Sequence, residues 1–272
     1  PAKVVDLKVN GSINAADFNQ MLVNMKSLLR LDLTDCDITE IPDEALSGKT
    51  QLQELILPNK LQTIGRNSFS NCIGLQRLTL QTGLQAIGER AFYGCISLQN
   101  LTLQTGLQTV GPSAFRGCAS LMGELNLPST VTTIGASAFV GTAYTSVKLP
   151  STLKTIGDYA FNGLSINQKL TLPSKVTSVG AYAFAGTKIT GLSIPDGVTS
   201  IGNYAFADTP IEGHVTIPDG VTYLGTGAFR NSQLSTVFLP NSVETLPQGL
   251  FQGCPNLNLV YVPDNYTSLS TS

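Results

Sequence analysis

The sequence predicts a right-handed α/β repeat solenoid of about twelve rungs, with parallel strands on one face and loops or short turns on the other. Three observations predict it. A phenylalanine recurs every 22–24 residues, an aliphatic residue stands five places before it, and each interval holds a short segment of alternating apolar and polar residues. A segment this short buries its apolar residues only against another copy, so we expect the units to stack around one continuous core.

The phenylalanines set the phase of the repeat. The aliphatic residue before each of them is followed by glycine in eight units, and by proline at Pro42 and Pro247. A tenth unit fits if Leu46 takes the place of phenylalanine, with Ile41 five residues earlier. The nine phenylalanines are Phe69, Phe92, Phe115, Phe139, Phe161, Phe184, Phe206, Phe229 and Phe251.

Each unit also predicts one short strand. A segment such as VKLP (147–150) points its two outer apolar residues inward and its middle residue outward. The proline ends the strand, because it fixes φ and offers no donor to the ladder. We expect equivalent strands at 78–80 and 101–103, where the sequence reads LTL in both places.

The two ends of the chain differ from its middle. We divide it into an N-terminal cap of strand plus helix (1–34), the solenoid (35–263) and a polar tail (264–272). Residues 4–11 read as a strand in register with the later ones, and the cap covers the first open edge of the core.

The predicted capping helix follows that strand. Its apolar residues recur at i, i+3, i+4 and i+7, which is one face of an amphipathic helix. Asn14 is suited to cap its first turn. The same stripe would also suit a partner-binding helix, but a cap is the favoured interpretation. The stripe consists of Phe18, Met21, Leu22 and Met25.

Composition narrows the possible partners. A net charge of −2 and a pI near 5.4 leave no basic footprint, which argues against nucleic acid and anionic membranes. No run of 18 apolar residues predicts a membrane-spanning segment. The chain begins at Pro1, so we expect a processed protein whose signal peptide has been removed.

The cysteines and the lone histidine do not predict catalysis. Four cysteines share one phase, three residues after phenylalanine, where other units carry Thr or Leu; this indicates a small packing slot rather than a metal site or disulfides. Cys36 lies outside the phase. His214 is the only imidazole and has no catalytic motif beside it. We therefore expect no enzyme, no metal and no cofactor. The phased cysteines are Cys72, Cys95, Cys118 and Cys254.

The repeated glycine needs a backbone explanation. It serves either a turn that requires positive φ or the close approach of the next coil. Because these glycines recur once per unit and never cluster as G-x-G-x-x-G, a phosphate cradle is not predicted.

The segment LQELILPNKLQTIGRNSFSNC (52–72) is similar to the leucine-rich repeat, and specifically to the BspA-like and Treponema-type subclass. The resemblance covers about residues 28–263. Two units depart from it, with Gln81 and Gln104 where proline is usual. Members of this family are bacterial surface or secreted adhesins, and their concave strands form the usual contact surface.

The resemblance implies where a ligand would sit. The middle residue of each strand faces outward on the concave sheet, and a second outward column precedes it. In these columns Phe238 and Tyr261 stand on adjacent rungs, where they either anchor a partner or cover the last open rung. The predicted ligand-binding residues are Phe238, Tyr261, His214, Lys148, Asn126 and Arg77.

The resemblance also implies a function. We expect a bacterial cell-surface or secreted protein that binds a protein ligand through its concave sheet, either a host extracellular-matrix protein or a protein of another cell. The alternatives are a carbohydrate-binding module and a passive envelope scaffold.

Overall fold

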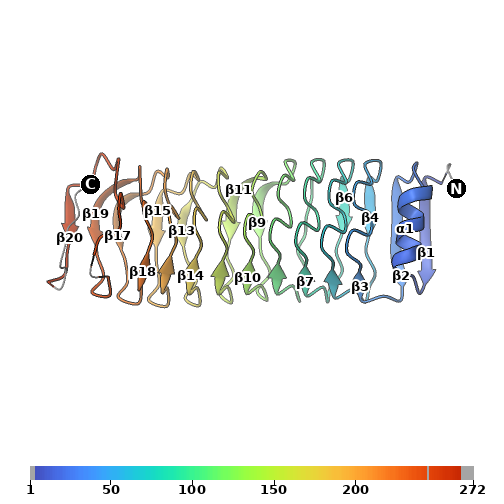
Figure 1. The fold of residues 1–272 in the computed structure, drawn as a ribbon, viewed down its shortest axis with the longest axis horizontal. Helices are drawn as coiled ribbons and strands as arrows, with labels where there is room; N and C mark the ends of the chain where they lie inside the picture. The colour runs from blue at the N-terminus through green and yellow to red at the C-terminus, as the bar shows by residue number, and fades with distance from the viewer. Residues whose placement is uncertain (1–3, 244, 265–272) are drawn as a thin grey trace.

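Eleven parallel strands line one face of the chain in the computed structural model, which describes residues 4–243 and 245–264. We call this face the strand face. A twelfth rung crosses it at Asn100, which forms a parallel bridge with Arg77. The rungs follow one another along the long axis (Figure 1), which confirms the predicted solenoid of about twelve rungs. The strands are β1 (Asp6–Gly11), β2 (Arg30–Cys36), β4 (Glu54–Ile56), β6 (Arg77–Thr79), β9 (Met122–Asn126), β11 (Ala143–Lys148), β13 (Lys169–Thr171), β15 (Gly191–Ser193), β17 (Glu212–Thr216), β19 (Gln233–Phe238) and β20 (Leu259–Tyr261).

In the part of the chain that the structure describes, a second sheet of nine two-residue strands runs along another side of the rungs, where the sequence predicts only loops or turns. It forms because the aliphatic residues share one phase, so that Ile134 pairs with Ile156. Gly157 N then donates to Ile134 O at 2.8 Å. The strands are β3 (Glu40–Ile41), β5 (Thr63–Ile64), β7 (Ala86–Ile87), β8 (Thr109–Val110), β10 (Thr133–Ile134), β12 (Thr155–Ile156), β14 (Ser178–Val179), β16 (Ser200–Ile201) and β18 (Tyr223–Leu224).

A column of phenylalanine rings forms the centre of the core. Successive rings from Phe69 to Phe251 are stacked, with centroids 5.1–6.1 Å apart. The rings from Phe69 to Phe229 are fully buried, whereas Phe251 is only partly buried. Leu46 is also fully buried, as expected of a residue that takes the place of phenylalanine. The phased positions therefore build the core.

The repeated glycine serves close approach of neighbouring rungs. A Cβ on Gly157 would lie only 2.6 Å from the backbone N of Ala136 in the preceding rung. Positive φ occurs elsewhere in the unit, two residues before and two residues after phenylalanine, for example at Tyr159 (φ 57°) and Gly163 (φ 71°). Of the two explanations that the sequence allows, the structure therefore supports the close approach of neighbouring rungs and not a requirement for positive φ at this glycine.

The predicted strand at 101–103 does not form. The next rung has one extra residue, at Gly123, between Leu121 and Leu125. Gly123 has φ 82°, and β9 pairs only with β11. Residues 101–103 are thereby left without a ladder partner on that side, and only the bridge at Asn100 remains.

The helix α1 (Ala15–Asn24) connects β1 to β2. Asn14 caps it as predicted: its Oδ1 accepts from the backbone N of Ala16 at 2.8 Å. The carboxylate of Asp17 accepts in return from Asn14 N at 2.8 Å, which completes a capping box. Among the described residues no helix has the length and apolar character to cross a membrane.

The helix is fixed to the first rungs of the solenoid. Phe18 and Met21 are buried in the core. Buried Lys49 donates from Nζ to the carbonyls of Met21 and Leu22, at the helix end where the macrodipole favours a cation. These contacts fit a cap, although its boundary at residue 34 stays a prediction. The polar tail lies outside the described residues from residue 265 on.

Candidate functional site

An exposed column of side chains runs along the strand face from β9 to β20. The parallel ladders place Lys148 opposite Asn126 and Tyr261 opposite Phe238. These residues point outward as the sequence predicts, and their role in binding stays a prediction. In chain order the column contains Asn126, Lys148, Thr171, Ser193, Thr216, Phe238 and Tyr261, all of them exposed.

Phe238 and Tyr261 form a flat apolar surface at the C-terminal end of this column. Their ring centroids lie 4.4 Å apart and their planes differ by 4°. Phe238 is 37% exposed and Tyr261 50%, with Leu259 beside them at 42%. A stacked pair that keeps this much apolar surface in solvent offers a planar contact for another molecule.

A hollow lies beside this column at β15. It has a volume of about 570 Å³ and spans β13, β15 and β17. It exists because Gly191 stands in an outward position where the neighbouring rungs carry Lys169 and His214. His214, a predicted site residue, therefore lies on its rim together with Glu212. The sequence signal for this hollow is a glycine in an outward strand position.

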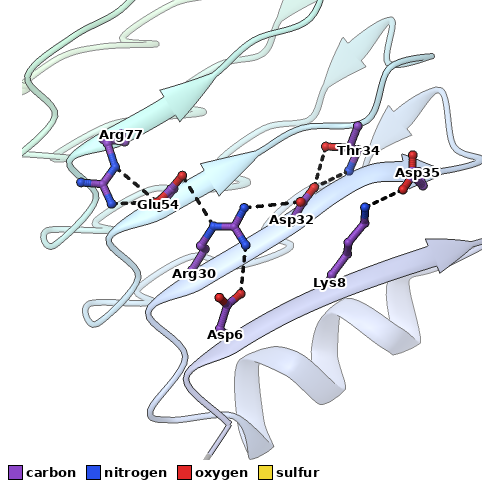
Figure 2. Close-up of polar contacts among 8 residues, drawn as sticks. All are labelled: Asp6, Lys8, Arg30, Asp32, Thr34, Asp35, Glu54 and Arg77. Carbon is purple, nitrogen blue, oxygen red and sulfur yellow. Dashed lines mark hydrogen bonds and ion pairs between the residues drawn. The ribbon is translucent and has the colours of Figure 1, made fainter.

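Charged side chains at the N-terminal end of the strand face neutralise one another (Figure 2). The guanidinium of Arg30 lies 3.1 Å from an Asp6 oxygen and 3.5 Å from an Asp32 oxygen. Its Nε lies 3.6 Å from Glu54, whose other oxygen pairs with Arg77 at 2.7 Å. Arg77 is thus engaged within the chain, and it lies apart from the other predicted site residues.

Asp32 anchors this network, although it is the middle residue of LDL (31–33), a position that the strand alternation predicts to face outward. It is only 8% exposed, because Thr34 donates to Oδ1 from its hydroxyl at 2.6 Å and from its backbone N at 3.0 Å. These two bonds are the main cause that lowers the pKa of Asp32, and the charges of Lys8 and Arg30 lower it further.

Replacing Asp32 with asparagine is expected to cost about 1–2 kcal/mol of unfolding free energy at pH 7. The pKa of Asp32 is lower in the folded chain, so its stabilisation is present above the unfolded value of about 3.9 and is lost as pH falls through the folded pKa. Urea unfolding at pH 7 and pH 3 should therefore show the gap between wild type and D32N narrowing in acid. A gap of constant size would contradict this role.

A ladder of tyrosines, which the sequence reasoning missed, lies outside the phenylalanine column. Tyr159, Tyr182 and Tyr204 stack with centroids 4.8 and 4.9 Å apart. Each has φ between 55° and 57°, a conformation that bulky side chains rarely adopt. The signal was present in the sequence as YAF in three successive units.

The repeat and its geometry match a known family. Residues 39–167 and 154–272 match the BspA type leucine-rich repeat region, in six copies. The chain belongs to the BspA-type leucine-rich repeat family. This confirms the resemblance seen in the sequence. None of the curated proteins matches the chain.

Solved structures share the fold of this BspA-type chain. A leucine-rich repeat protein from Bacteroides ovatus is 23% identical, with a TM-score of 0.67 over 96% of this chain and 70% of that one. A leucine rich cell surface protein from Faecalibacterium prausnitzii is 24% identical, with a TM-score of 0.54 over 96% and 78%. A leucine-rich repeat protein from Eubacterium ventriosum is 20% identical, with a TM-score of 0.53 over 94% and 73%.

The phased cysteines of this BspA-type chain fill a small slot, as predicted. Cys95 Sγ donates to the carbonyl of Phe69 in the preceding rung at 3.2 Å. Thr187 fills the same slot and donates to Phe184 O at 2.7 Å. Burial raises the pKa of the Cys72 thiol, which makes it a poor nucleophile. Within the described ranges the cysteines are free, and no three His, Cys, Asp or Glu side chains are grouped to hold a metal.

Proposed function

We propose that this chain is the binding module of a bacterial cell-surface or secreted protein. It holds a protein ligand, from a host extracellular matrix or from another cell, against its strand face. The observation that carries this proposal is the exposed column that ends in the stacked pair Phe238 and Tyr261. Aromatic side chains of this kind are the residues that most often dominate the energy of an interface.

Three further observations support the proposal. Membership of the BspA-type family supports binding by an extended surface, which is what solenoids provide. The similar structure from F. prausnitzii is described as a cell surface protein, which supports an extracellular location. His214 stands exposed on the rim of the hollow, a placement that suits ligand contact better than acid–base catalysis.

A glycan is the second candidate ligand. The outward residues between Lys148 and Phe238 carry hydroxyl groups, and the hollow at Gly191 lies among them. Hydroxyls and a flat aromatic surface are suited to hydrogen-bond and stack on sugar rings. A passive envelope scaffold is the third reading, and it predicts binding to neither class of ligand.

The test is a binding panel of immobilised matrix proteins (collagens, laminin and fibronectin) and a glycan array. Replacing both Phe238 and Tyr261 with serine should weaken binding at least tenfold and change the melting temperature little. Tyr223→Ser is the matched control, since Tyr223 is 52% exposed on the second sheet. Undiminished binding by the double variant would overturn the proposal. A lost fold would show that the pair covers the last rung instead.

A further inference from the structure

The tyrosine ladder ends where two glycines follow it. Gly227 and Gly249 occupy the ladder position in the next two rungs, both with positive φ. A Cβ on Gly227 would lie 2.4 Å from Cε1 of Tyr204, so the Tyr204 ring leans over that glycine. A Cβ on Gly249 would meet nothing nearer than Gln252 Oε1 at 3.5 Å. Space therefore remains open beyond the last ring.

That space is a small pocket with a volume of about 170 Å³. One wall is the ring of Tyr204, and the others are polar side chains and bare backbone. The pocket has the size of one small ring with its substituents rather than of a peptide or an extended polymer. It is lined by Tyr204, Thr226, Gly227, Arg230, Gln248, Gly249 and Gln252.

Arg230 gives this pocket a cation that forms no ion pair with any of the described residues. Its Nε is buried from solvent and has no hydrogen-bond partner among the described residues. No carboxylate of residues 4–243 or 245–264 forms an ion pair with its guanidinium. A guanidinium is matched best by two carboxylate oxygens bound side by side, and its two terminal Nη groups can bind a carboxylate in this way even where Nε is covered. Among the described residues, therefore, no carboxylate neutralises the Arg230 charge in this pocket.

We propose that this pocket binds the carboxylate of an acidic sugar, a hexuronate, whose ring stacks on Tyr204. The carboxylate accepts from Arg230, and the amides of Gln248 and Gln252 meet the ring hydroxyls. The apolar face of the pyranose ring stacks on the ring of Tyr204, where the next tyrosine of the ladder would otherwise lie. The site lies at the turns that contain the tyrosine ladder, away from the strand face. It is a second binding site, in addition to the surface of the proposed function.

The experiment titrates the whole chain with glucuronate and galacturonate, followed by NMR. Glucose and galactose supply the ring without the charge, while acetate and inorganic phosphate supply a charge without the ring. We expect both uronates to bind at least tenfold more tightly than any of these four. If acetate or phosphate bound as tightly as the uronates, the stacking of the sugar ring on Tyr204 would be contradicted. If glucose or galactose bound as tightly as the uronates, the ion pair with Arg230 would be contradicted. No binding of the uronates would overturn the site.

Variants locate the binding. Arg230→Gln should weaken uronate binding about 10- to 100-fold, whereas Arg116→Gln, an exposed arginine in the same repeat phase, should leave it unchanged. Gly249→Asn should block the pocket and keep the fold, because Asn67 occupies the same phase with φ 52°. Unchanged affinity in either Arg230→Gln or Gly249→Asn would overturn the proposal. Uronate binding should survive the loss of Phe238 and Tyr261, so it is tested apart from the strand face.

Discussion

Replacing Phe161 with alanine is expected to lower the free energy of unfolding by about 3–5 kcal/mol. Phe161 is fully buried and stacks between Phe139 and Phe184, with centroids 5.6 and 5.1 Å away. Alanine leaves a cavity that stacked rungs cannot close, because each contacts only its two neighbours. Chemical denaturation should also become less cooperative, since the stack is interrupted near its middle.

Phe251→Ala is the matched control. The same side chain is lost at the end of the column, where Phe251 is only partly buried and has one stacked neighbour, Phe229. Its cost should be clearly smaller, because less apolar surface is lost from the core. Equal costs at the two positions would contradict a core that is continuous through the rungs.

Gly157→Ala is expected to destabilise the chain by about 1–3 kcal/mol or more, through overlap rather than through lost burial. The added Cβ would stand 2.6 Å from Ala136 N and 2.7 Å from Gly135 C, and both are backbone atoms of the preceding rung. Neither atom moves without separating the rungs and weakening the bond from Gly157 N to Ile134 O. Thermal or urea unfolding measures the loss.

Gly163→Asn separates this effect from the conformational role of glycine. Gly163 has φ 71°, and a Cβ there would meet nothing within 4 Å. Asn71 and Asn231 already occupy the same phase with positive φ, so asparagine should change stability by only a few tenths of a kcal/mol. If Gly163→Asn lowered the free energy of unfolding strongly and Gly157→Ala lowered it little, the roles of close approach at Gly157 and of positive φ at Gly163 would be wrongly assigned.

Most of the fold follows from the phase of a few residue types. Phe161 and its equivalents recur at a fixed offset, and only stacking buries all of them, so the core could be predicted without coordinates. Which segments pair as strands is harder to predict from the sequence. The second sheet depends on backbone register, and the missing strand at 101–103 follows from one extra residue in the next rung.

The sequence predicts those parts of the candidate site that are built from outward side chains. It does not predict those that arise where a side chain is missing. Phe238 and Tyr261 stand in outward strand positions, and strand alternation alone places them together. The hollow at Gly191 and the pocket beyond Tyr204 arise from missing side chains, and their shape depends on how neighbouring chains lean. The pairing of Arg77 with Glu54 likewise depends on rotamers that the repeat does not specify.

The most direct test of the central claim, that partners bind the strand face, is site-specific blocking. In a Cys254→Ser background, Ser193→Cys and Tyr223→Cys each receive a bulky maleimide label. Serine suits the slot of Cys254 because Ser232 fills it one rung earlier, and the remaining cysteines are buried. The label at Ser193 should abolish binding to the matrix proteins and to the neutral glycans of the panel, and the label at Tyr223 should not. Full binding with Ser193 labelled, or loss only with Tyr223 labelled, would contradict the claim.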